Sequence, residues 1–269
     1  MRPGAGCPGG PRIPREDPRR SLPAPHIRRA GRAPEGVLTA RPLLTLVLLP
    51  GLDGTDVFYR PLIAELPPWI RAVVVELPTT GPNDYETLLD HVDHATRDLR
   101  DVILVGFSFS GPLALCLASR RPSRVRALVL MATFVRLPRP HLRRIAFLTR
   151  PWMVALLRLL RRLPSWVDPS AGARRAAKRE TWRRVPAATI ARRLRAVIDV
   201  DATRHLRQCP LPMLNLAFNG DEAVPARNAD AIQAAGPAAT CVRLDGHHLT
   251  VFDEPSVVAA VLLRFLAGL

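Results

Sequence analysis

The stretch Val102-Ile103-Leu104-Val105-Gly106-Phe107-Ser108-Phe109-Ser110-Gly111 decides the fold that this sequence predicts. Its apolar, β-branched start predicts a buried strand, and the apolar segment 112–118 that follows predicts a buried helix. A serine at the apex of such a strand-turn-helix is exposed at the end of a sheet. The free N–H groups and the positive dipole end of the helix point at the same place. The stretch therefore predicts a nucleophile elbow.

Two serines compete for the apex of this turn. Ser108 has the small residues Gly106 and Ser110 two positions before and after it, which relieves crowding in so tight a turn. Ser110 is followed two residues later by Pro112, which is not small and lacks a backbone N–H. We interpret Ser108 as the nucleophile and Ser110 as a small residue of the turn.

The composition indicates one globular domain with an insertion. The chain has 269 residues, of which 48% are hydrophobic, so it can bury one sizeable core. It contains no run of about eighteen uncharged apolar residues, so no transmembrane segment is expected. The four cysteines, Cys7, Cys116, Cys209 and Cys241, lie far apart and suggest neither a metal site nor a disulfide framework. We expect a cytoplasmic protein.

The net charge of +16 is unevenly distributed. Residues 1–41 hold nine arginines against three acidic residues, and residues 136–207 hold eighteen arginines and one lysine against four. The rest of the chain is mildly acidic, so the basic character belongs to a tail and one middle segment. Lys178 is the only lysine, so a general bias toward arginine is a competing explanation.

The alternation of strands and helices predicts a mostly parallel sheet flanked by helices. Residues 1–40 are rich in Pro, Gly and Arg and are expected to be a disordered tail. The core is expected to comprise residues 41–135 and 208–269. Its strands are predicted at 43–49, 72–77, 102–105, 125–131, 213–218 and 240–244, and its helices at 58–66, 84–100, 112–120, 225–235 and 254–267.

The alternation stops between residues 136 and 207. Segments 139–150, 151–163, 170–184 and 186–197 all read as helices separated by prolines. We interpret 136–207 as a helical cap insertion over the carboxyl ends of the strands, where open α/β sheets bind their ligands.

An Asp and a His follow the last two predicted strands. A serine hydroxyl needs a base within hydrogen-bonding reach and a third group that orients the base. Asp221 comes directly after the strand at 213–218, and Glu222, Asp199 and Asp201 are weaker rivals for the acid. His247 and His248 follow the strand at 240–244, and Gly246 favours His247 because it allows a close approach. The chain order Ser, Asp, His fits this architecture.

The same chemistry needs backbone donors for an oxyanion. The N–H of Phe109, directly after the nucleophile, is one candidate. The glycine-rich turn Pro50-Gly51-Leu52-Asp53-Gly54 follows the first core strand, and we expect the N–H of Leu52 to be the other.

The chain resembles the α/β-hydrolase superfamily over about residues 43–269, in particular its small-cap carboxylesterases. The resemblance is carried by four motifs, at residues 49–55, 106–111, 219–225 and 246–247. It implies a serine hydrolase with Ser108, Asp221 and His247 as catalytic triad and with no cofactor and no metal. Ser110 stands where glycine is commoner, and Pro50-Gly51 where many relatives have His-Gly.

Three hypotheses follow. The main one is a carboxylic ester hydrolase that acts on a small-molecule ester through an acyl-enzyme. In the second, the basic cap docks an acidic carrier, such as acyl carrier protein, through Arg139, Arg143, Arg144, Arg158, Arg161 and Arg162. The third is a non-catalytic protein whose basic cap or tail, including the amphipathic segment 152–162, binds a membrane surface or nucleic acid. An intact triad argues against the third, so no nucleic-acid partner is expected.

Overall fold

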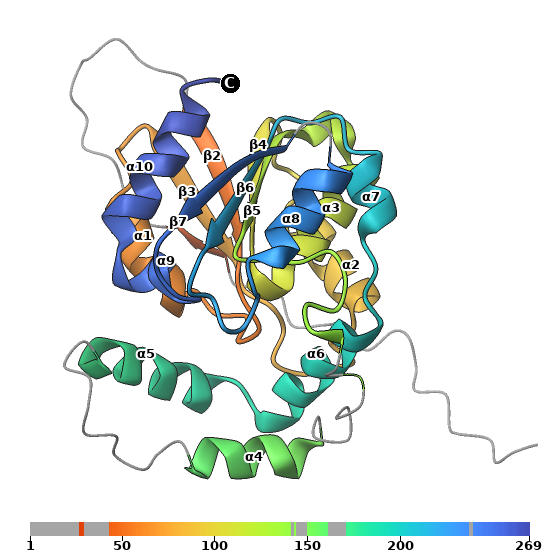
Figure 1. Ribbon diagram of the computed structural model, residues 1–269, viewed down its shortest axis with the longest axis vertical. Helices are drawn as coiled ribbons and strands as arrows, with labels where there is room; N and C mark the ends of the chain where they lie inside the picture. Colours follow the sequence, from red (N-terminus) through yellow and green to blue (C-terminus); the bar gives the residue numbers. More distant parts are fainter. Residues whose placement is uncertain (1–26, 30–42, 141–142, 144–149, 161–170, 237–238) are drawn as a thin grey trace, which may run out of the picture.

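The computed structural model describes residues 27–29, 43–140, 143, 150–160, 171–236 and 239–269. Within these residues a seven-stranded sheet has the order β1-β3-β2-β4-β5-β6-β7 (Figure 1). All neighbouring strands are parallel except β1, which lies antiparallel beside β3 at one edge. The strands are Ile27–Arg29 (β1), Leu44–Leu49 (β2), Ile70–Val75 (β3), Val102–Phe107 (β4), Val125–Met131 (β5), Met213–Phe218 (β6) and Ala239–Leu244 (β7). The predicted mostly parallel sheet is confirmed.

Helices cover both faces of the sheet (Figure 1). One apolar cluster joins the sheet to α2, α3, α7 and α8, and a second joins it to α1, α9 and α10. This explains why β4 is a continuous apolar run and why β4 and β6 are both buried along their whole length. The helices are Arg60–Ala64 (α1), Tyr85–Ala95 (α2), Gly111–Arg120 (α3), Pro151–Leu160 (α4), Ala171–Arg184 (α5), Ala187–Asp199 (α6), Thr203–Arg207 (α7), Arg227–Ala235 (α8), Thr250–Asp253 (α9) and Pro255–Leu266 (α10).

The strand order reverses direction at β2. The chain passes from β2 to β3 on one side and returns to β4 on the other, so the loops after β2 and β4 lie side by side. Such a switch point is where open α/β sheets place their ligands. The turn that carries Leu52 is thereby brought next to Ser108.

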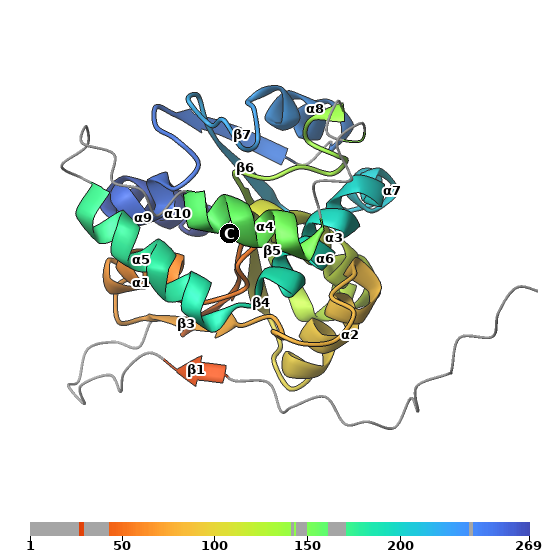
Figure 2. The same ribbon diagram turned by 90° about the horizontal axis from the view of Figure 1, so that it is seen from below.

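Helices α4, α5 and α6 form a separate layer over the carboxyl ends of the strands (Figure 1). Seen from below, α4 and α5 extend across this end of the sheet (Figure 2). The predicted helices at 151–163, 170–184 and 186–197 correspond to α4, α5 and α6, while most of the predicted helix at 139–150 lies outside the described residues. Helix α7 was not predicted and packs on the core against α3 and α8.

The expectation of a disordered tail fails at one place, the strand β1. Ile27–Arg29 pairs with Val73, Val74 and Val75 of β3. The reason is that an edge strand offers unpaired backbone groups, and pairing with them requires no apolar periodicity in the partner. The rest of the predicted tail, residues 1–26 and 30–40, lies outside the described residues. Among the helices that the structure describes, none has the length and apolarity needed to cross a bilayer.

Candidate active site

Ser108 lies at the apex of a strained turn directly after β4. Its φ is +52°, in the left-handed region that non-glycine residues rarely adopt. A Cβ on Gly106 would lie 2.8 Å from the Cα of Gly111, so the turn needs glycine there. Thr133 donates a hydrogen bond from Oγ1 to the Ser108 carbonyl, and Ser110 donates one from Oγ to the carbonyl of Pro50. The elbow is therefore fixed from both sides.

His248 bridges Ser108 and Asp221. Its Nε2 lies 2.8 Å from Ser108 Oγ, and its Nδ1 lies 2.7 Å from Asp221 Oδ2. Asp221 is buried, and its Oδ1 accepts hydrogen bonds of 2.8 Å from the N–H groups of Ala223 and Val224. We assign the ring proton to Nδ1, because a carboxylate oxygen needs a donor, which leaves Nε2 to accept the serine hydroxyl proton.

The structure corrects the predicted base from His247 to His248. His247 Nε2 pairs with Asp253 Oδ2 at 3.0 Å, and its Nδ1 accepts a 3.1 Å hydrogen bond from the N–H of Leu249. Both ring nitrogens of His247 are thus engaged away from Ser108. The ring of His248 instead stacks on Phe107, with centroids 5.2 Å apart. Asp253 pairs with His247 and leaves His248 to contact Ser108. Nothing in the sequence indicates which of the two histidines Asp253 contacts.

Of the acids considered in the sequence, Asp221 is the one that contacts His248. The rivals Asp199 and Asp201 are exposed and pair with Arg143 and Arg136, respectively. Glu222 is exposed at the rim of the cavity described below.

Both residues predicted to donate to an oxyanion have fixed backbones. Phe109 follows Ser108, and its carbonyl accepts a 2.9 Å hydrogen bond from Tyr85 Oη, whose ring stacks on that of Phe109. Leu52 is the second residue of a turn in which Gly54 N–H donates to the Gly51 carbonyl at 2.9 Å. Leu52 and Ser108 line the same cavity.

A cavity of about 860 Å³ lies between the core and the cap, with Ser108 and His248 in its wall. This volume is in the range of small-molecule sites. Most of its lining is apolar and comes from both layers: Leu52, Phe58, Phe107, Val154, Trp182, Val185, Ile190, Leu194 and Leu249. On α4, Val154 is buried against this cavity, whereas Trp152 and Leu156 are exposed.

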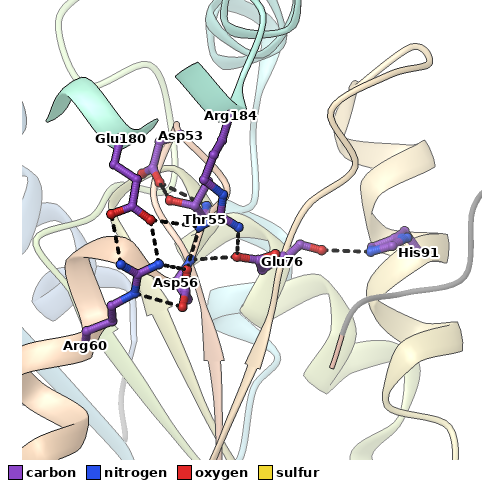
Figure 3. Close-up of polar contacts among 8 residues, drawn as sticks. All are labelled: Asp53, Thr55, Asp56, Arg60, Glu76, His91, Glu180 and Arg184. Atoms are coloured by element: carbon purple, nitrogen blue, oxygen red, sulfur yellow. Dashed lines mark hydrogen bonds and ion pairs between the residues drawn. The ribbon is translucent and has the colours of Figure 1, made fainter. Parts of the chain in front are cut away.

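An ion-pair cluster, which we call the α5 latch, ties the cap to the core (Figure 3). It consists of Asp56, Arg60, Glu76, Glu180 and Arg184. Arg184, the last residue of α5, pairs with Asp56 at 2.7 Å and with Glu76. Arg60 pairs with Asp56 at 3.0 Å and with Glu180 at 2.7 Å. Burial alone would raise the pKa of Asp56, but hydrogen bonds from Arg60 and Arg184 hold it well below its usual value.

Comparison with known proteins identifies the family of this chain. The profile of the Alpha/beta hydrolase family matches residues 46–261. The chain belongs to this family, which supports hydrolase chemistry in general.

Solved structures share the fold over most of the chain. A hydrolase from Pseudomonas aeruginosa is 21% identical with a TM-score of 0.71, covering 89% of this chain and 93% of its own. The enol-lactonase of Burkholderia xenovorans is 18% identical with a TM-score of 0.72, covering 90% and 96%. A thermophilic esterase from Thermogutta terrifontis is 20% identical with a TM-score of 0.70, covering 91% and 93%.

One curated relative matches a shorter part of the sequence. Phytyl ester synthase 1, chloroplastic, of Arabidopsis thaliana is 34% identical over an alignment of 93 residues that covers 32% of this chain. The match spans 13% of the length of that relative.

Proposed function

We propose that this chain is a serine hydrolase that cleaves a carboxylic ester through an acyl-enzyme. The observation that carries the proposal is the hydrogen-bonded chain from Ser108 through His248 to Asp221 in the wall of a mostly apolar cavity. A nucleophile, its base and an orienting acid at these distances are the arrangement that activates a serine hydroxyl.

The reaction follows from the positions of these groups. Ser108 Oγ attacks the ester carbonyl carbon while His248 Nε2 takes the hydroxyl proton. The N–H groups of Leu52 and Phe109 hold the resulting oxyanion. When the C–O bond of the ester breaks, His248 returns the proton to the leaving alcohol. In the second half of the reaction, water attacks the acyl-enzyme carbonyl while His248 takes a proton from it. His248 then returns this proton to Ser108 Oγ as the acid is released, and Asp221 keeps the imidazole oriented throughout.

The cavity favours esters with an extended apolar group. Apolar side chains from α4, α5 and α6 face the nucleophile across it, and such walls bind hydrocarbon by excluding water. The Arabidopsis relative is named for ester synthesis. In the scheme above, that reaction is the attack of an alcohol, in place of water, on the same acyl-enzyme.

The test is hydrolysis of a short p-nitrophenyl ester by the wild-type chain and by Ser108→Ala. We expect Ser108→Ala to keep its fold, measured by circular dichroism, and to lose turnover and labelling by a fluorophosphonate probe. Undiminished turnover in this variant would end the proposal. A wild-type chain that neither turns over esters nor takes up the probe would support the non-catalytic alternative.

A second candidate is hydrolysis of an ester carried on an acidic protein. The observation in its favour is that Arg139 donates a hydrogen bond to the carbonyl of Glu222. Because Glu222 lines the cavity, an arginine of the cap lies at the edge of that cavity. Arg139 is half-buried, whereas Arg143 is exposed and pairs with Asp199. Steering by such charges depends on ionic strength, so a salt-insensitive rate on a carrier-bound ester would remove this candidate.

A further inference from the structure

Arg193 is a fully buried cation that the catalytic scheme above leaves unexplained. It lies on the cap helix α6 and has 0% of its surface exposed. Its three nitrogens donate to neutral oxygens: Nε to Asn83 Oδ1 at 2.9 Å, Nη1 to the Leu52 carbonyl at 2.8 Å and Nη2 to the Pro78 carbonyl at 2.9 Å. Burying a charge is costly unless its polar atoms are satisfied, and the planar guanidinium is the side chain that can reach three such acceptors.

Hydrogen bonds hold the peptide groups on both sides of Leu52, and Arg193 supplies one of them. The peptide before Leu52 contains its N–H and the Gly51 carbonyl, and this carbonyl is held by Gly54 N–H. The peptide after Leu52 contains the carbonyl that accepts the hydrogen bond from Arg193. With both peptide planes held, the direction of the Leu52 N–H is set.

The turn is shaped to receive the guanidinium. Gly54 has a φ of +72°, and a Cβ at this position would lie 2.8 Å from Arg193 Cζ. Only glycine allows this backbone and this approach together. Burial lowers the pKa of Arg193 to about 10, with the nearby Asp53 carboxylate acting in the opposite direction, so the side chain remains a cation at neutral pH.

We propose that Arg193 is a positioning residue that holds the Leu52 N–H toward the oxyanion, so that docking of the cap completes the oxyanion hole. The inference rests on the proposed function, because it needs Leu52 to act as a donor in ester hydrolysis. Arg193 is the one fully buried arginine among the residues that the structure describes. The inference explains why its side chain extends from the cap helix to the turn after β2.

The experiment compares Arg193→Met and Arg193→Lys with Arg192→Met. Arg192 is the adjacent residue of α6 and is exposed, with a 3.1 Å hydrogen bond to the Gly81 carbonyl, so it controls for the loss of one cap arginine. The measurements are kcat and KM on a soluble ester, and the inhibition constant of a trifluoromethyl ketone with the same acyl chain. This ketone forms an adduct with the serine that carries an oxyanion, so its affinity reports on the oxyanion hole.

For Arg193→Met we expect kcat to fall about tenfold to a hundredfold, with KM within about twofold and the inhibition constant raised in parallel with the loss in kcat. Arg193→Lys should lie between Arg193→Met and the wild type, and Arg192→Met should match the wild type. A folded Arg193→Met with the kcat and inhibition constant of Arg192→Met, or with a change in KM alone, would overturn the inference.

Three further outcomes are decided by the same variants. If Arg193→Met does not fold, Arg193→Lys decides: a lower kcat at unchanged KM supports the role of Arg193, and wild-type values overturn it. Turnover that survives Ser108→Ala would overturn the proposed function and this inference with it. An inactive Ser108→Ala beside a fully active Arg193→Met overturns the inference alone.

Discussion

At the scale of single residues, the two adjacent histidines allow a sharp comparison. We expect His248→Asn to lower kcat by about a thousandfold or more, because it removes the group 2.8 Å from Ser108 Oγ. His247→Asn should stay within about fivefold of the wild type, since the ring nitrogens of His247 contact Asp253 and the N–H of Leu249 and not Ser108. The measurement is turnover of a p-nitrophenyl ester together with the rate of fluorophosphonate labelling. The reverse order of the two variants would contradict the assignment of the base.

This pair of histidines also shows how much of the candidate site can be predicted from the sequence. Strand ends place Ser108, Asp221 and the two histidines at one sheet edge, because parallel strands share the direction of their carboxyl ends. The choice between His247 and His248 depends on how the turn at Gly246, with its φ of +135°, rotates the two side chains. That rotation is set by contacts with Phe107 and Asp253, which the sequence alone does not bring together.

At the scale of elements, the α5 latch predicts a dependence of stability on pH. The pKa of Asp56 is lowered in the folded state, so its ionised form favours folding. This stabilisation is present above the unfolded pKa, near 3.8, and is lost as the pH falls below it. We expect Asp56→Asn to lower the free energy of unfolding by about 1–2 kcal/mol at pH 7, because hydrogen bonds to two arginines are weakened.

The measurement is urea unfolding of the wild type and Asp56→Asn at pH 7 and at pH 3. The difference between the two proteins should shrink at the lower pH, where the wild type loses the contribution of the Asp56 charge. Asp98→Asn is the matched control, because Asp98 is highly exposed and pairs with the exposed Arg97. A difference that stays constant between the two pH values would show that Asp56 acts by packing alone.

The arginines of the cap show why these contacts could not be predicted. In the sequence they read as a general bias toward arginine, with docking to an acidic partner as the alternative. In the structure Arg174 pairs with Asp253 at 2.9 Å, Arg184 belongs to the α5 latch, and Arg193 binds the turn at Leu52. Each of these arginines has a partner in the core that lies more than seventy residues away in the sequence, so these cap-to-core contacts are fixed by the fold and leave no local pattern.

At the scale of the whole molecule, the cavity between core and cap predicts a preference for long apolar acyl or alcohol groups. Val154 of α4 lines this cavity, whereas Leu156 of the same helix is exposed. Val154→Trp should fill part of the space and lower kcat/KM for a dodecanoate ester about tenfold relative to a butyrate ester. Leu156→Trp adds the same ring outside the cavity and should leave that ratio unchanged. Equal ratios in the two variants would mean that the substrate chain does not lie under the cap.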